Sequence, residues 1–217
     1  MMNNKRMILL NIILLIVLVG GGFAGYYFYD QSISYIKTDN AQIAGQQISI
    51  ASPATGKLKE WKGETGTSFT KNQKIGTVEV VTESGTTDMD ITVPENSTIV
   101  QSSAVPNTFI AAGTSLAKSY DLENLWVTAN VDETDINKVK VGQEVDLYVD
   151  SYPDTVLTGK VDSLGLATAG TFSLLPSNNS SGNYTKETQV IPVTISIDNY
   201  GGLKLIPGMN VSVRIHK

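Results

Sequence analysis

The stretch Ile50-Ala51-Ser52-Pro53-Ala54-Thr55-Gly56-Lys57-Leu58 has a second, altered copy in this chain, and this repeat decides the fold. The second copy begins at Ile91, 41 residues further on, and the two copies align without gaps. Matched positions carry apolar residues or proline, in the pairs Ile50 and Ile91, Pro53 and Pro94, Leu58 and Ile99, Phe69 and Ile110, and Ile75 and Leu116. Self-similarity at a fixed spacing indicates a repeated structural unit.

Each copy reads as a strand, a proline turn, a second strand, a polar loop and a third strand. The surrounding sequence is rich in Val, Ile, Thr and Gly, in short alternating runs that are typical of strands. A half-unit of this size cannot bury its own apolar face. We therefore expect the two copies to interlock into one small β-sandwich with pseudo-two-fold symmetry, in a protein that is mainly β.

Composition excludes several classes of function. The 217 residues carry a net charge of −5 with scattered acidic residues, so no basic stripe is present that would bind nucleic acid. Cysteine is absent, which excludes disulfides, thiolate metal sites and cysteine nucleophiles. The only histidine, His216, is the penultimate residue, and we interpret it as an exposed strand end. We predict no enzyme, no metal site and no cofactor.

The N-terminal region, residues 1–30, has the pattern of a membrane anchor. Lys5 and Arg6 precede the apolar stretch Met7–Tyr29, whose length suits a transmembrane helix of about 20 residues. Positive residues before the helix predict a cytoplasmic N-terminus and an extracytoplasmic body. The alternative is a cleaved signal peptide, but this apolar stretch is too long and ends in bulky aromatic residues. Gly21 and Gly25 form a GxxxG step at which another helix could pack closely.

The C-terminal region, residues 121–217, predicts a small antiparallel β-barrel. Alternating or apolar runs predict strands at residues 124–131, 144–149, 157–164, 188–197 and 209–215. Residues 132–141 predict one short helix, with Asp132 as its N-cap. A long polar, glycine-rich connection occupies residues 167–187, and loops of this length are often functional.

The repeat resembles the two half-motifs of a lipoyl or biotinyl domain, here within residues 31–120. Carrier domains bear their cofactor on a lysine in the hairpin between the halves, but residues 81–87 at this join contain none. The missing lysine favours the haemolysin-secretion-D (HlyD) family of membrane fusion proteins, in which a lipoyl-like domain is only a structural element. Thr38-Asp39-Asn40-Ala41-Gln42 is also similar to that family's first strand, and the C-terminal strand order resembles its β-barrel domain.

Residues 171–176, Thr-Phe-Ser-Leu-Leu-Pro, followed by an Asn- and Gly-rich stretch, resemble the EmrA-like multidrug-resistance branch of this family. The resemblance implies a homo-oligomeric adaptor whose partner is a polytopic membrane transporter, and it favours a major facilitator exporter. Phe172, Leu174 and Leu175 are the candidate partner contacts, and the alternative is that these apolar side chains form a packed lid. The family's long helical hairpin is missing between the halves, which favours a single-membrane, Gram-positive cell.

Three alternatives remain open on the sequence. The chain could serve an ATP-binding-cassette exporter instead of a major facilitator. It could be a stand-alone, membrane-tethered envelope β protein, which would associate with no transporter. It could be a tethered biotinyl or lipoyl carrier, for which the missing lysine is the discriminating feature.

Overall fold

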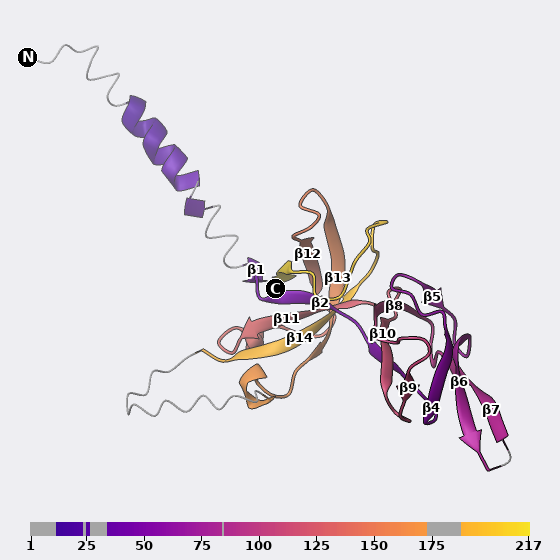
Figure 1. The fold of residues 1–217 in the computed structure, drawn as a ribbon. Coiled ribbons are helices and arrows are strands. Elements are labelled where there is room, and N and C mark those ends of the chain that lie inside the picture. Colours follow the sequence, from indigo (N-terminus) through magenta and orange to yellow (C-terminus); the bar gives the residue numbers. More distant parts are fainter. Residues whose placement is uncertain (1–11, 24, 27–33, 84, 173–187) are drawn as a thin grey trace, which may run out of the picture. The chain divides into compact units, whose positions relative to one another are not determined.

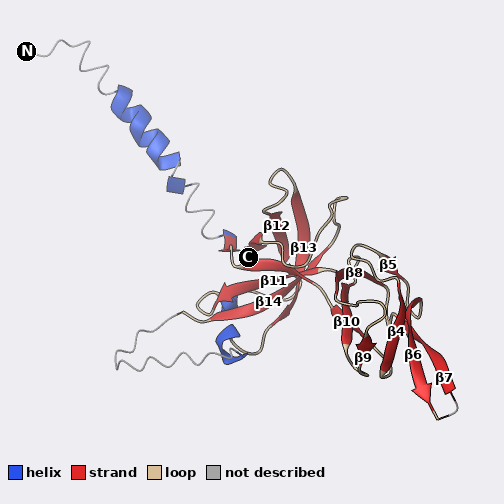
Figure 2. Cartoon of the chain, in the orientation of Figure 1, coloured by secondary structure: helices blue, strands red, loops and turns tan. Residues whose placement is uncertain are grey.

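The computed structural model describes residues 12–23, 25–26, 34–83, 85–172 and 188–217. The described chain folds into two compact units (Figure 1). One unit contains residues 42–127 and 200–209; the other contains residues 128–199, residues 210–217 and the described residues up to 41. Figure 2 shows strands throughout both units and helix only in short segments. The prediction of a mainly β protein is confirmed.

The N-terminal region is described in part. Residues 12–23 are helical, as are residues 25 and 26. In the described part of the chain, no helix combines the length and the apolar character that crossing a membrane requires. Other residues of the expected span, Met7–Tyr29, lie outside the described part.

Eight strands form the repeat unit, and they build two sheets of four. The strands are β3 (Gln47–Ala51), β4 (Gly56–Trp61), β5 (Ser68–Phe69), β6 (Lys74–Thr82), β7 (Gly85–Thr92), β8 (Ser97–Ser102), β9 (Phe109–Ile110) and β10 (Ser115–Tyr120). One sheet has the order β3-β10-β8-β5 and the other β7-β6-β4-β9. Each sheet therefore contains strands from both copies of the repeat, so the predicted interlocking is confirmed.

Equivalent hydrogen bonds join the two copies in both directions. The amide of Gly66 donates to Ile99 O at 2.8 Å, and the amide of Asn107 donates to Leu58 O at 2.7 Å. Gly66 and Asn107 are separated by the same 41 residues as the repeat, and both have positive φ, of 90° and 68°. Matched turns and matched bonds show that the repeat is a pseudo-two-fold symmetry of the backbone.

The repeat positions supply the core of this unit. Its buried apolar cluster consists of Ile50, Leu58, Phe69, Ile75, Val78, Ile91, Val93, Ile99, Leu116 and Ala117. Ile110, the counterpart of Phe69, is half-buried against the cluster. The apolar pairs that revealed the repeat are thus the residues that pack between the two sheets.

Seven strands form the second sheet system, a nearly closed barrel. They are β1 (Tyr35–Thr38), β2 (Ala41–Ala44), β11 (Trp126–Asp132), β12 (Glu144–Val149), β13 (Val156–Leu164), β14 (Val190–Ile197) and β15 (Val211–His216), in the order β1-β15-β12-β13-β14-β11-β2. The edge strands β1 and β2 are consecutive in the chain, so the corner between them joins the two edges. Asn130 Nδ2 donates to Asn40 Oδ1 at 3.1 Å at this corner.

Two sequence-based expectations differ from this arrangement. The helix expected at residues 132–141 is reduced to a 3-10 turn, η1 (Ile136–Lys138). Asp132 is the last residue of β11 and does not cap a helix, because residues 133–135 form a turn in which the amide of Asp135 donates to Asp132 O at 2.9 Å. The amide of Glu133 donates to Gln189 O at 2.9 Å. The segment 35–44, expected in the lipoyl-like region 31–120, supplies strands β1 and β2 of the seven-stranded sheet.

Candidate partner-binding surfaces

The long connection was predicted to carry the partner contacts. Phe172 is the last residue of a 3-10 turn, η2 (Ala169–Phe172), whereas Leu174 and Leu175 lie outside the described residues. The turn is held by a hydrogen bond from the amide of Thr171 to Thr168 O at 3.0 Å. The structure therefore describes the start of this connection, and a role of the three residues in binding a partner stays a prediction.

Leu166, two residues after β13, is a candidate that the sequence did not single out. Its side chain is fully exposed, with a relative accessibility of 104%. Its neighbour Gly165 approaches Pro192 closely: the amide of Gly165 donates to Pro192 O at 2.7 Å, and an added Cβ would lie 2.8 Å from the proline ring. The backbone at the base of the connection is thus fixed against β14 while Leu166 points to solvent.

The glycines of the N-terminal helix are the other predicted packing site. Gly21 and Gly25 both lie in helical segments, and an added Cβ at either would meet no atom within 4 Å. The positions are open on the described part of the helix. Their role in helix packing stays a prediction.

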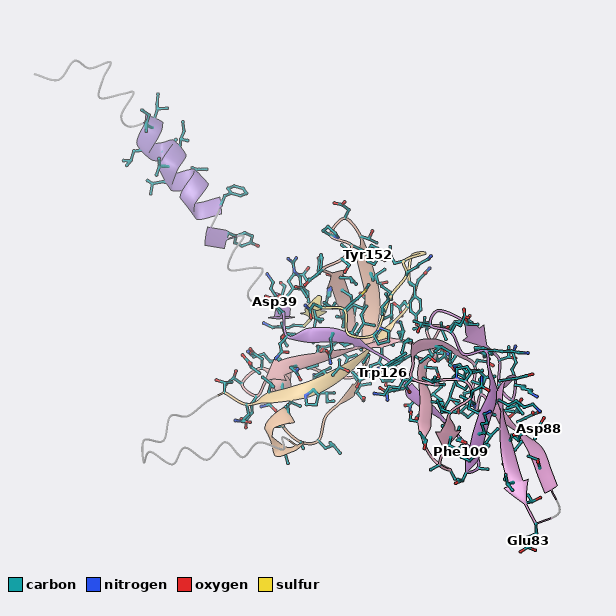
Figure 3. The ribbon with its side chains drawn as sticks, viewed as in Figure 1. Asp39, Glu83, Asp88, Phe109, Trp126 and Tyr152 are labelled. Atoms are coloured by element: carbon teal, nitrogen blue, oxygen red, sulfur yellow. The ribbon has the colours of Figure 1, made fainter. Side chains whose placement is uncertain are left out.

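The hairpin that joins the two halves carries no attachment lysine. Strands β6 and β7 are paired up to Thr82 and Gly85, and Thr82 Oγ1 donates to Gly85 O at 2.8 Å. Figure 3 shows Glu83 at the tip. Two lysines of this sheet form ion pairs with β7: Lys59 Nζ, on β4, lies 2.9 Å from Asp88 Oδ2, and Lys74 Nζ, on β6, lies 2.6 Å from Asp90 Oδ1. In each case the hydrogen bond to the carboxylate raises the pKa of the lysine.

The two sheets of the repeat unit present different outer faces. On the β7-β6-β4-β9 sheet, one row across the strands contains Phe109, Lys57, Glu79 and Asp88. Phe109 is 77% exposed, and Figure 3 shows Phe109 and Asp88 on this unit. The symmetry-equivalent row on the other sheet contains Ser68, Thr98, Tyr120 and Gln47. One row is charged and aromatic, and its counterpart is uncharged.

A depression lies beside the uncharged row. It has a volume of about 330 Å³ and is lined by strand residues and by the turn at Ile206, Pro207 and Gly208. Tyr120 forms one wall, and the amide of Gly208 donates to Ile43 O at 2.7 Å. The end of the β3-β10-β8-β5 face is therefore partly occupied by the chain's own turn.

His216 has a defined structural role that the sequence did not predict. Its Nε2 lies 3.0 Å from Asp146 Oδ2, and its ring meets that of Tyr35 edge-on with centroids 4.8 Å apart. The histidine thus connects β15 to β12 and to β1. The interpretation as an exposed strand end was incomplete because both partners are distant in the sequence.

No group of three or more His, Cys, Asp or Glu side chains among the described residues is arranged to hold a metal ion. The features that stand out on these surfaces are exposed apolar side chains and charged side chains on strands, which are suited to binding other molecules.

Comparison with known proteins agrees with this architecture. Residues 46–121 match the family model for the YhbJ barrel-sandwich hybrid domain, and residues 125–215 match that for the YknX-like β-barrel domain. The putative efflux system component YhbJ of Bacillus subtilis is 44% identical over 185 residues, which cover 85% of this chain and 81% of that protein. The colistin resistance protein EmrA of Acinetobacter baumannii is 45% identical over 93 residues, which cover 42% of this chain but only 26% of that protein.

A solved structure shares the fold across both units. The membrane fusion protein Spr0693 from Streptococcus pneumoniae superposes with a TM-score of 0.56 at 15% identity, over 85% of this chain and 97% of that one. The two matched domains and the long alignment with YhbJ show the family to which the chain belongs. The chain belongs to the YhbJ family of short membrane fusion proteins, composed of a barrel-sandwich hybrid domain and a β-barrel domain.

Proposed function

We propose that this protein is the membrane-anchored adaptor subunit of an efflux system. The observation that carries the proposal is the 44% identity to a putative efflux system component over most of both chains. A lipoyl-like unit without a hairpin lysine supports the same function, because such a unit can act in assembly and lacks the attachment point of a carrier domain. The adaptor works by binding, and it is not an enzyme.

The proposed topology is a single transmembrane helix at Met7–Tyr29 with a cytoplasmic N-terminus and an extracytoplasmic body. Lys5 and Arg6 before the apolar stretch support this orientation. Packing of a transporter helix at Gly21 and Gly25 belongs to the same proposal. The Bacillus subtilis relative supports a Gram-positive, single-membrane setting. The two-residue join between β6 and β7 supports it too, because no long arm is present at that position.

The proposed partner is a polytopic transporter of the major facilitator type. The support is the resemblance of residues 171–176 to the EmrA-like branch and the local identity to EmrA proteins, of which this chain covers about a quarter. Phe172, Leu174 and Leu175 are the proposed contacts, and exposed Leu166 extends this apolar set on the described side of the connection. The adaptor acts as a homo-oligomer around the transporter.

The test is a pull-down in mild detergent from native membranes, followed by mass spectrometry of the copurifying proteins. We expect the full-length chain to recover a major facilitator exporter, and a variant that lacks residues 7–29 to lose it. Recovery of an ATP-binding-cassette transporter would replace the proposed partner class. Recovery of no transporter by the full-length chain would overturn the adaptor function in favour of a stand-alone envelope protein.

A further inference from the structure

We propose that the turn at residues 140–143 of the β-barrel rests on the outer surface of the lipid bilayer, with the Val141 side chain inserted among the lipid headgroups. This inference rests on the proposed transmembrane helix at residues 7–29. It goes beyond that helix because it assigns to the barrel a second contact with the membrane. The residues that make this contact are Val141 and its neighbour Lys140.

The chain between the proposed span and the barrel is short. The span ends at Tyr29, and β1 begins at Tyr35. The amide of Lys217 donates to Ser34 O at 3.0 Å, so the barrel already holds the chain at Ser34. A fully extended segment of five residues reaches at most about 18 Å. In the proposed topology, the end of the barrel at which β1 begins therefore lies within about 18 Å of the bilayer.

The turn at residues 140–143 lies at this same end of the barrel. Strands β1 and β12 both pair antiparallel with β15, so they run in the same direction. The chain therefore enters both strands from one end, and the turn immediately precedes β12. The amide of Gly142 donates to Val161 O at 2.8 Å, which fixes the turn beside β13. Val141 is thus located at the end of the barrel that the chain enters from the membrane.

The fold does not require an exposed apolar side chain at this position. Val141 is 64% exposed, whereas Val139, at 5%, supplies the buried side chain of this segment. The same kind of turn recurs in the described chain: the fourth amide donates to the first carbonyl oxygen, and the third residue has positive φ. The second residues of these turns are Lys71, Ala112, Val141 and Pro207. Because such different side chains occupy the second position, the exposed valine is free to serve binding.

Hydrogen bonds hold the turn in one conformation. The amide of Lys140 donates to Gln143 Oε1 at 2.8 Å, and Gln143 Nε2 donates to Lys138 O at 3.2 Å. A side chain presented by a fixed backbone loses little conformational entropy when it binds. Lys140 is exposed beside Val141, and its aliphatic stem can lie along the lipid while its ammonium group stays among the phosphates. An apolar side chain next to a lysine suits the boundary between headgroups and acyl chains.

The anchor makes such a small contact sufficient. One valine is too weak to hold a soluble protein at a membrane, but a barrel tethered within about 18 Å meets the surface at a high effective concentration. Charges of both signs lie at this end, since Glu144 pairs in register with Lys160. The contact therefore depends on the apolar side chain and does not require anionic lipid.

The experiment measures the depth of the turn with a fluorescent label. The chain contains no cysteine, so a single one can be introduced as the labelling site. Full-length Lys140→Cys is labelled and reconstituted into phosphatidylcholine vesicles that contain nitroxide-bearing lipid. We expect the nitroxide to quench this label severalfold more than a label on Val156→Cys. Val156 is the matched control, because it is 49% exposed on the same barrel and lies about 17 Å along β13 from Val161.

A second substitution tests Val141 itself. Val141→Asp, added to the labelled Lys140→Cys chain, is expected to remove most of the extra quenching, because a carboxylate is costly to transfer out of water. Val156→Asp makes the same change at the other end of β13 and is expected to leave the quenching unchanged. Both valines are exposed, so we expect circular dichroism and thermal unfolding to show that both variants are folded.

Flotation of the vesicles separates this inference from the topology on which it rests. If the full-length chain does not float with the vesicles, the proposed helix does not anchor it, and both the helix and the turn contact are wrong. If the chain floats but the labels at positions 140 and 156 are quenched equally, or Val141→Asp changes nothing, the turn contact alone is overturned. Transporter recovery in the pull-down tests the adaptor function separately.

Discussion

At the residue scale, the repeat positions form the buried core of the lipoyl-like unit. Leu58 is fully buried, at 0% accessibility, between the two sheets, where it packs with residues of both copies. Its amide also donates to Thr108 O at 2.9 Å, so side chain and backbone are both held by the second copy. Truncating a buried leucine removes apolar contacts and leaves a cavity.

We therefore expect Leu58→Ala to lower the free energy of unfolding by about 2–5 kcal/mol. Its neighbour Lys57 is only partly buried, and Lys57→Ala is expected to change stability by less than about 0.5 kcal/mol. Urea denaturation of the full-length chain, monitored by tryptophan fluorescence, measures both. Equal effects of the two substitutions would contradict the assignment of Leu58 to the core.

Some of these residue roles could be predicted from the sequence, and others could not. The gap-free repeat predicted the core because burial recurs at the matched apolar positions. Phe109 was missed, yet a signal existed: its counterpart Ser68 is polar, and comparing the two copies position by position exposes the difference. His216 could not be assigned, because its partners Asp146 and Tyr35 become neighbours only through strand pairing between distant segments.

At the element scale, the strands were predictable and the helix was not. The strand expected at residues 144–149 coincides with β12, because its alternation is regular and its ends are marked by polar residues. The helix expected at residues 132–141 gave way to a 3-10 turn, although its ends carried charges of the favourable sign. The hydrogen bond from the amide of Glu133 to Gln189 O, a residue distant in the sequence, outweighs those weak local preferences.

Val139 anchors the turn that replaced the helix. Its side chain is 5% exposed, and its amide donates to Ile136 O at 3.0 Å. Val139→Ser removes the buried apolar group and is expected to cost about 2 kcal/mol of unfolding free energy. Val141, two residues on, is 64% exposed, and Val141→Ser is the matched control with little expected effect. Thermal unfolding by calorimetry distinguishes the two, and a similar melting temperature for both would refute the anchoring role.

At the scale of the whole molecule, the lipoyl-like unit is not continuous in the sequence. Residues 200–209, from the C-terminal half, pack with residues 42–127, which the repeat alone could not predict. Tyr200 is the clearest link: its hydroxyl accepts from the amide of Leu125 at 2.6 Å and donates to Glu123 O at 2.7 Å. A single side chain thus satisfies a donor and an acceptor in the segment that follows β10.

Tyr200→Phe removes both bonds and keeps the ring. We expect a loss of about 1–2 kcal/mol in unfolding free energy, because the amide of Leu125 is left without its partner. Equilibrium denaturation of the full-length chain measures the loss. Tyr148→Phe, on β12, keeps the ring that lies against Arg214 and provides a comparison at another tyrosine. An equal or smaller effect at Tyr200 would show that the two bonds contribute little.

The connection between β13 and β14 links the barrel to the proposed partner contacts. These strands pair from Gly159 with Ile197 to Leu164 with Val193, with one register shift between Val161 and Ser163, so the barrel can hold them together without the connection. Replacing residues 168–185 with a short Gly-Ser linker is therefore expected to leave the thermal unfolding temperature within a few degrees of the original. The same variant is expected to lose the transporter in the pull-down, since Phe172, Leu174 and Leu175 are removed. A second variant, Leu166→Ser, retains the connection and tests the exposed residue at its base. Full transporter recovery by the folded deletion variant would show that the contact lies elsewhere, and the role of the connection would be abandoned.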